Sequence, residues 1–251
     1  MKKLLLGAAV ALLPLTGMAA TVLGLQVGAG SWKHDPSGSF TASVADIGSS
    51  ADLKNDLNLA EKSESYSYFV IEHPVPLIPN FKYVNTKLSS SGAGSIATDF
   101  TFNGDNYTAN NAVTSSFTLD QTDAIFYYEI LDNDLVSFDL GLNAKKIDGK
   151  ASAISTADGA NESVTFSGTV PMLYAAAEIG LPAGFALAGE ISTLSIGDNE
   201  ISDVTAKVTY TTDFNLGLEA GVRTMSVKVD VDNVLASMDF KGIFFGAFLK
   251  F

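Results

Sequence analysis

The sequence predicts an all-β fold, a transmembrane antiparallel up-and-down β-barrel of about ten strands, with eight or twelve strands as the alternatives. Three observations predict it. The 251-residue chain is 47% hydrophobic and only 17% charged, yet after the N-terminal segment no run approaches the roughly 18 apolar residues of a membrane-spanning helix. Apolar and polar residues instead alternate over roughly 9–11 residues, the length of a strand that crosses a bilayer. The chain also ends on an aromatic residue, Phe251.

The N-terminal segment has the pattern of a secretory signal peptide. MKKLLLGAAVALLPLTGMAA begins with two lysines, continues with a short apolar core and has small residues, Gly17 and Ala19, at the −3 and −1 positions of a cleavage site. A transmembrane anchor is the alternative, but the core is short for one. We therefore expect residues 1–19 to be cleaved and residues 20–251 to form the barrel. Loss of the two lysines moves the net charge from −13 to −15.

The strands of the predicted barrel are recognised by a period of two. In LVSFDLGLNAK (135–145) the apolar residues fall on one face, and Asp139 and Lys145 fall on the other. FNLGLEAGVRT (214–224) and the C-terminal GIFFGAFLKF (242–251) repeat this pattern. A soluble β-sandwich also alternates, but its strands average roughly five or six residues. Ten such runs lie near 21–32, 64–74, 80–91, 115–131, 135–149, 162–180, 184–196, 200–212, 214–230 and 239–251.

The connections between these runs alternate between short and long, as in outer-membrane barrels. The short turns are 73–80, 132–134, 181–184 and 211–214, with a further tight turn at 197–200. The long loops, expected on the outer surface, are 33–63, 92–114, 150–161 and 231–238. Leu53, Leu57 and Ala60 have helical spacing, so the first long loop holds either a short surface helix or a polar loop with local structure.

The C-terminal strand carries a recognisable arrangement of residues. In GIFFGAFLKF the terminal Phe251 follows apolar residues at alternate positions, among them Phe245 and Leu249, and Gly246 stands near the middle. This arrangement resembles the C-terminal signal of Gram-negative outer membrane proteins, although Phe244 takes a position that is typically polar. The resemblance implies that Phe245, Gly246, Leu249 and Phe251 form an insertion signal read by the barrel insertion machinery.

Two further segments resemble a known family. They are the glycine-rich LGLQVGAGSW (23–32) and HPVPLIPN (73–80), whose three prolines lack backbone donors and so place this turn outside the hydrocarbon. On these features the mature chain resembles uncharacterised proteobacterial outer membrane β-barrel proteins. The resemblance implies a location in the cell outer membrane, in contact with its lipid and lipopolysaccharide, and it implies almost nothing about activity, because that family has no assigned chemistry.

Charged residues on the polar faces are expected to point into the barrel, because the apolar faces meet lipid. Charges confined in this way must pair, since an isolated buried charge costs several kcal/mol. The first interpretation is a structural ion-pair network that fills the lumen, and the alternative is a polar pore lining or a gate. The eleven residues are Glu72, Lys82, Glu129, Asp139, Lys145, Glu178, Glu190, Lys207, Glu219, Arg223 and Lys250.

The composition excludes several classes of function. The absence of cysteine excludes thiol catalysis, cysteine metal sites and disulfides, and the strong negative charge is unsuited to nucleic acid. The only histidines, His34 and His73, are expected on opposite sides of the membrane, and His34 beside Asp35 is a weak match to a hydrolytic site, so no enzyme is predicted. The acidic loops 197–200 and 230–233 lack the ligand set of a calcium loop, which leaves only loose binding of divalent cations near lipopolysaccharide. No metal site, cofactor or catalytic residue is predicted.

Two functions are expected for such a barrel. The first is a structural or surface-interaction role with a plugged lumen, and the alternative is a narrow porin-like channel for small solutes or ions. A surface adhesin would need exposed aromatic anchors at the outer end. The candidates for such anchors are Trp32, Phe40, Phe100, Phe102 and Tyr107. The sequence leaves the solute and the oligomeric state open.

Overall fold

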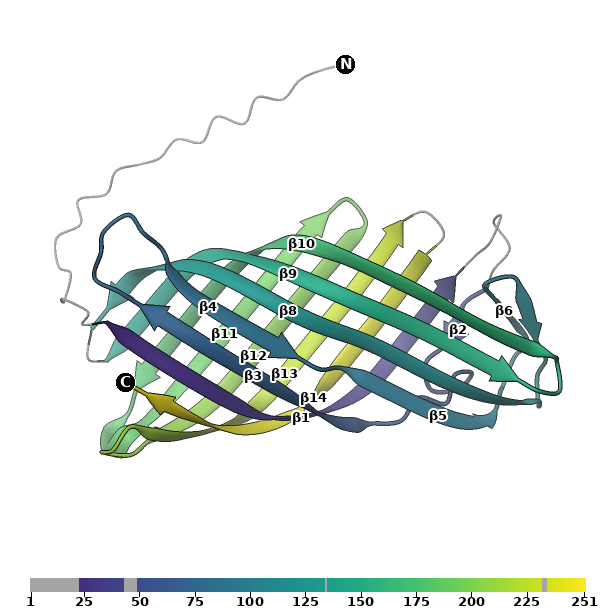
Figure 1. Ribbon diagram of the computed structural model, residues 1–251, viewed down its shortest axis with the longest axis horizontal. Helices are drawn as coiled ribbons and strands as arrows, with labels where there is room; N and C mark the ends of the chain where they lie inside the picture. Colours follow the sequence, from purple (N-terminus) through teal and green to yellow (C-terminus); the bar gives the residue numbers. More distant parts are fainter. Residues whose placement is uncertain (1–22, 43–48, 134, 232–233) are drawn as a thin grey trace, which may run out of the picture.

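The computed structural model of the protein describes residues 23–42, 49–133, 135–231 and 234–251, and strands dominate it (Figure 1). The predicted signal peptide, residues 1–19, lies outside the described residues. In the described part of the chain, no helix has the length and apolar character needed to cross a membrane. The elements are β1 (Gly24–Ala42), β2 (Ala51–Asp52), β3 (Lys62–Glu72), β4 (Asn80–Thr86), β5 (Ser89–Ser95), β6 (Phe100–Phe102), β7 (Asp105–Tyr107), β8 (Ala112–Asp132), β9 (Val136–Ser155), β10 (Ala160–Gly180), a 3-10 turn (Pro182–Gly184), β11 (Phe185–Ile196), β12 (Asn199–Thr211), β13 (Leu216–Val231) and β14 (Val234–Lys250).

Ten strands close into an antiparallel barrel, which confirms the predicted fold class (Figure 1). The wall runs through β1, β3, β4 and β8 to β14 in chain order, and β5 continues β4 after an interruption at Lys87 and Leu88. β14 pairs with β1 along both strands and closes the ring. The terminal residue takes part, because the Phe251 N–H donates to Leu25 O over 2.7 Å and the Leu25 N–H donates to Phe251 O over 3.1 Å.

Each predicted run corresponds to one barrel strand, but most strands extend farther at the outer end than predicted. β8, β9 and β10 contain 21, 20 and 21 residues. The predicted loop 150–161 is therefore reduced to a turn at 156–159, and β13 and β14 are separated by two residues instead of the predicted loop 231–238. The predicted bounds of these outer loops were wrong, because the strands continue into them.

The first long loop, predicted to begin at residue 33, is shorter for the same reason. β1 continues to Ala42, although Pro36 and Gly38 suggested a loop. Pro36 has no backbone N–H to donate, and the strand tolerates this. The ladder between β1 and β3 stops at His34, so at Pro36 β1 pairs only with β14 and its other edge makes no ladder hydrogen bonds. Gly38 has a φ of 103°, a left-handed conformation that glycine adopts without strain.

The remaining outer segments fold back onto the barrel. The surface helix considered for 51–64 does not form: β2 is followed by one turn, in which the Leu57 N–H donates to Asp52 O over 2.9 Å. The predicted loop 92–114 contains the β6–β7 hairpin. Leu57 and Phe102 are both buried in the same apolar cluster as the barrel interior, so the two segments cap the outer end.

The two faces of β9 exchange their chemistry halfway along the strand. In the half near the short turns, Leu140 and Leu142 are exposed outside while Lys145 is buried inside. In the outer half, Lys146 is exposed outside while Ile147 is buried inside. The alternation itself is unbroken, so the exchange comes from the sequence and not from a shift in register.

β13 changes at the same level, from Glu219 and Arg223 inside to Met225 and Val227 inside. The barrel therefore has two halves. The half near the short turns has an apolar exterior and a polar lumen, and the outer half has a polar exterior and an apolar interior. We call the exterior of the first half the apolar belt. Its exposed members include Leu25, Val27, Phe126, Leu140, Leu142, Leu173, Ile179, Leu187, Val208, Leu218, Val222, Ile243, Phe245 and Leu249.

The wall of the outer half is incomplete beside β10. β10 pairs with β9 along almost its full length but with β11 only from Leu173 to Gly180. Pro171, which cannot donate a backbone hydrogen bond, stands just beyond the end of this second ladder. At this edge the inward-facing Phe166 is only partly buried against the apolar cluster. The outer half is therefore closed by packed side chains as well as by strand pairing.

Candidate functional site

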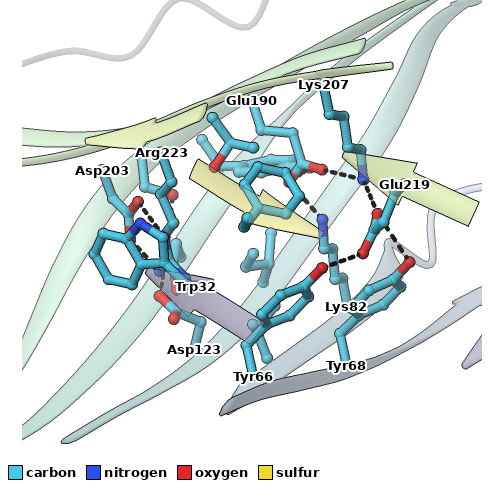
Figure 2. A pocket seen from close by; sticks show the side chains of 17 residues that line it. Trp32, Tyr66, Tyr68, Lys82, Asp123, Glu190, Asp203, Lys207, Glu219 and Arg223 are labelled. Atoms are coloured by element: carbon cyan, nitrogen blue, oxygen red, sulfur yellow. Dashed lines mark hydrogen bonds and ion pairs between the residues drawn. The ribbon is translucent and has the colours of Figure 1, made fainter. Parts of the chain in front are cut away.

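The lumen contains three successive layers. At the short turns lies an open cavity of about 560 Å³, here called the vestibule. Beyond it stand eight paired charges, the ion-pair network, which surround a smaller cavity of about 90 Å³, the chamber (Figure 2). Apolar side chains, the apolar plug, fill the outer half. Each layer is built by the inward-facing residues of successive strands.

Lys145 on β9 is the centre of the first part of the network. Its Nζ lies 2.8 Å from Asp123 Oδ1 on β8 and 3.0 Å from Asp203 Oδ2 on β12, and it donates to Gln121 Oε1 over 3.0 Å. The Lys145 side chain is 1% exposed. Removal of an ammonium group from water is costly, and two carboxylates with one amide oxygen offset that cost here.

Arg223 on β13 joins Asp203 from the other side. Its Nε and Nη2 donate to the two Asp203 oxygens over 2.9 and 2.7 Å, a bidentate pair, and its Nη1 donates to Thr86 Oγ1 over 2.9 Å. The guanidinium also lies over the Trp32 ring, 4.8 Å from its centroid. Arg223 thus connects the charged layer to the apolar layer above it.

Glu190 and Glu219 hold the second part of the network, nearer the vestibule. Lys207 Nζ lies 3.0 Å from Glu219 Oε2 and 3.4 Å from Glu190 Oε1, and Lys82 forms a second ion pair with Glu190. The Tyr66 hydroxyl donates to Glu219 Oε1 over 2.7 Å. The two Lys207 contacts join neighbouring strands, whereas the Lys82–Glu190 and Tyr66–Glu219 contacts join strands that do not pair with each other and so cross the lumen (Figure 2).

The network is balanced in charge. It contains the bases Lys82, Lys145, Lys207 and Arg223 and the acids Asp123, Glu190, Asp203 and Glu219. Six of these eight are among the residues predicted from the sequence. Asp123 and Asp203 were missed, although each shares the inward face of its strand with a residue nearer the short turns, Tyr127 and Lys207 respectively.

The other predicted charges are not part of this network. The structure places them around the vestibule. The eleven charges that were predicted to form one network therefore lie at two levels of the lumen. These residues are Glu72, Glu129, Asp139, Glu178 and Lys250. Glu72 accepts a hydrogen bond from the Tyr127 hydroxyl over 2.9 Å.

The apolar plug fills the lumen above Arg223. Its residues are at most 1% exposed, and they are Trp32, Phe40, Phe117, Leu119, Met225 and Phe240. Phe117 and Phe240 stack with centroids 5.9 Å apart, and Phe40 packs against Phe117 at 6.4 Å. These side chains pack against one another and are shielded from solvent.

The aromatic residues considered as adhesin anchors are therefore not available as anchors. Trp32 and Phe40 belong to the plug, and Phe100, Phe102 and Tyr107 are buried in the hairpin that caps it. Tyr107 is held there by a hydrogen bond of 2.7 Å from its hydroxyl to Ala153 O. Apolar residues in outer loops had been expected outside, but here they face the interior.

The two histidines lie apart, as expected, but His34 is not at an outer rim. It is fully buried on the inner face of β1, between Trp32 at 5.2 Å and Phe240 at 6.0 Å between ring centroids. Its sequence neighbour Asp35 faces outward and pairs with Lys54 at 2.6 Å. Within the described residues, no group of three or more histidine or acidic residues could hold a metal ion, and part of loop 230–233 lies outside them.

The predicted insertion signal lies on β14. Phe245 and Leu249 point outward in the apolar belt, 65% and 41% exposed, and Phe251 is 66% exposed at the end of the strand. Gly246 faces the lumen, where an added Cβ would overlap the Tyr66 hydroxyl. The structure therefore gives Gly246 a packing reason of its own.

Comparisons with known proteins identify no family. No protein-family model matches the chain, and no curated protein matches it. Two crystal structures of the toluene transporter TodX of Pseudomonas putida are similar, with 9% and 8% identity and TM-scores of 0.36 and 0.27. Each match covers 90% of this chain and 89% of the TodX chain. TM-scores this low carry no argument about function, and the fold assignment rests on the strand pairing.

Proposed function

We propose that the protein is an integral barrel of the cell outer membrane with a closed lumen and a structural or surface-interaction role. One observation carries the proposal: two different layers, the ion-pair network and the apolar plug, fill the same lumen in succession. A channel needs a continuous wet path, and either layer alone interrupts it. The polar exterior of the outer half is the surface offered for contacts.

The outer-membrane location is supported by the apolar belt together with the C-terminal strand. The belt supplies the lipid-facing surface, and the aromatic end of β14 resembles the insertion signal described above. The partners proposed are therefore membrane lipid and lipopolysaccharide around the belt, and the barrel insertion machinery during assembly.

Single-channel recording in a planar bilayer tests the closed lumen. We expect no discrete current steps from the unchanged protein, with folding verified by its heat-dependent shift on a gel. Phe117→Ala with Phe240→Ala removes the stacked pair of the plug, and Lys82→Ala with Glu190→Ala removes a charge pair of the network. Each pair of substitutions alone is expected to stay silent, because the other layer remains.

The variant with all four substitutions is expected to conduct, which would show that the recording detects this barrel once its lumen is opened. Steady openings from the unchanged protein would contradict the proposal and support the alternative, a narrow porin-like channel.

A further inference from the structure

The chamber has two buried polar atoms that no described residue satisfies. They are Trp32 Nε1, a donor, and Asn143 Oδ1, an acceptor, and both side chains line the cavity. Trp32 is 0% exposed and Asn143 is 2% exposed. Buried polar groups are nearly always hydrogen-bonded, so a free donor and a free acceptor in one cavity point to an occupant.

The charged groups around the chamber are already paired. The Asn143 amide donates to Asp123 Oδ1 over 2.6 Å and to Ser192 Oγ over 3.0 Å, which leaves only its oxygen unused. The eight charges of the network balance in sign. An ion in the chamber would disturb that balance, so the occupant is uncharged.

The chamber is small. Its volume of about 90 Å³ corresponds to about three water molecules at ~30 Å³ each. A single organic occupant is therefore limited to a few non-hydrogen atoms. It must carry one acceptor for the Trp32 N–H and one donor for the Asn143 carbonyl, as a primary amide does.

The chamber is closer to the vestibule than to the outer surface. Five residues line both cavities and form the partition between them: Tyr68, Lys82, Tyr174, Glu190 and Lys207. Lys82 and Lys207 are both ion-paired with Glu190, so a solute passes from the vestibule only when these side chains move apart. On the other side the chamber ends at Trp32 and Arg223, below the packed plug. A solute can therefore enter only through the vestibule and must leave the same way.

We propose that the chamber is a dead-end binding site for a small uncharged polar solute of the primary-amide type, admitted from the short-turn end. This goes beyond a structural role, because it assigns a ligand site to the lumen. It requires the closed plug and does not depend on which membrane holds the barrel.

Fluorescence quenching by acrylamide tests this directly. Trp32 is the only tryptophan of the chain, so the emission reports on the chamber alone. Acrylamide is a small primary amide and also a quencher. We expect quenching that saturates with acrylamide concentration, is relieved by the non-quenching analogue propionamide, and is not reproduced by iodide.

A matched pair of variants on β12 locates the site. Thr205 lines the chamber and Thr209 lines the vestibule, both on the inner face of the strand. Thr205→Ile is expected to abolish the saturable quenching by filling the chamber, with Thr205→Val as a smaller change should the first variant not fold. Thr209→Ile is expected to leave it unchanged.

The route of entry is tested with single cysteines, since the chain has none. A bulky maleimide on Ser137→Cys, in the vestibule, should block quenching, whereas the same label on Ser195→Cys, on the exposed exterior of β11, should not. Quenching that is weak, linear in acrylamide and equal in Thr205→Ile and the unchanged protein means that the chamber holds water only, which overturns the proposal.

Discussion

The Tyr66 hydroxyl donates a hydrogen bond of 2.7 Å to Glu219 Oε1, which joins β3 to β13 across the lumen. Tyr66→Phe should lower the free energy of unfolding by about 1.5–3 kcal/mol, the range for a hydrogen bond to a charged group. Tyr68 is the matched control, because its hydroxyl lies 3.3 Å from the same carboxylate. Urea unfolding in lipid vesicles, followed by tryptophan emission, should show a smaller loss for Tyr68→Phe. Equal losses would contradict a special role for the shorter bond.

Lys145→Met should be the most damaging single change on β9. It leaves Asp123 and Asp203 short of their shared cation, and loss of one partner of a buried pair costs about 3–5 kcal/mol. Lys146→Met is the control one residue away, since that ion pair with Asp148 is exposed and worth at most about 1 kcal/mol. The same unfolding measurement compares them. A mild effect of Lys145→Met would mean that water reaches the network freely.

The apolar belt predicts where a new charge is tolerated. Leu140 lies outside in the belt, 42% exposed, so Leu140→Arg should cost about 2–4 kcal/mol if the belt meets hydrocarbon. Ser167→Arg is the control on the polar exterior of β10 and should change stability by no more than about 0.5 kcal/mol. Both are measured by unfolding in phospholipid vesicles. A similar small effect of the two changes would place the belt outside the membrane.

Asp158, in the turn between β9 and β10, should make the outer cap sensitive to acid. Hydrogen bonds from the Ser155 hydroxyl, then from Thr108 and Asn111, lower the pKa of Asp158 from 3.8 to about 2. Because the folded pKa lies below the unfolded one, this stabilisation is present above about pH 4 and is lost as the pH falls toward 2. Pepsin cleavage of the hairpin segment, corrected with an unstructured reference peptide, should accelerate over that range.

The matched variant for that experiment is Asp158→Asn, which cannot ionise. Its cleavage rate should already be raised at pH 4 and should change little on further acidification. An unchanged protein whose corrected rate is flat between pH 4 and 2 would contradict the role given to Asp158.

The contribution of the Phe251 ring can be tested separately from that of the terminal backbone. Phe251→Ala keeps the two backbone hydrogen bonds to Leu25 and removes only the ring. If the ring is part of an insertion signal, this variant should insert slowly in cells but refold normally in detergent, where no machinery is present. Phe214→Ala removes an equally exposed ring, 74% exposed, from a short turn and should insert at the normal rate. Normal insertion of Phe251→Ala would contradict the signal.

Period-two alternation was sufficient to predict the strand number and order, because it depends only on which side chains share a face. It did not predict the strand lengths. The rule that apolar residues face outward holds only within the belt. Beyond Lys145 the sequence of β9 still alternates, but there the apolar residues face inward and the polar residues face outward. Phe40 and Phe117 illustrate the error: both are apolar residues in the outer half of the barrel, and both face inward.

The charged site was predictable in part. Residues near the short turns, such as Glu219 and Lys207, could be assigned to the lumen because every second side chain of a strand faces the same side. When the same alternation is followed farther along β8 and β12, it also places Asp123 and Asp203 on the inward face. Four of the six ion pairs of the network join neighbouring strands, but Lys82–Glu190 and Lys145–Asp203 join strands four and three places apart along the wall. Which charges meet across the lumen in this way could not be predicted from the sequence. That pairing depends on the diameter and stagger of the closed barrel.

The exchange of faces described for β9 and β13 also bears on the depth at which the barrel would sit in a membrane. A shift of two residues along a strand moves the chain by roughly 6–7 Å. Outward displacement would bring Leu142 and Ile243 into water, and inward displacement would bring Lys146 and Lys241 into hydrocarbon. Either displacement acts on many strands at once, so small costs add. The side chains on the exterior of the wall thus favour one depth of the barrel in a membrane.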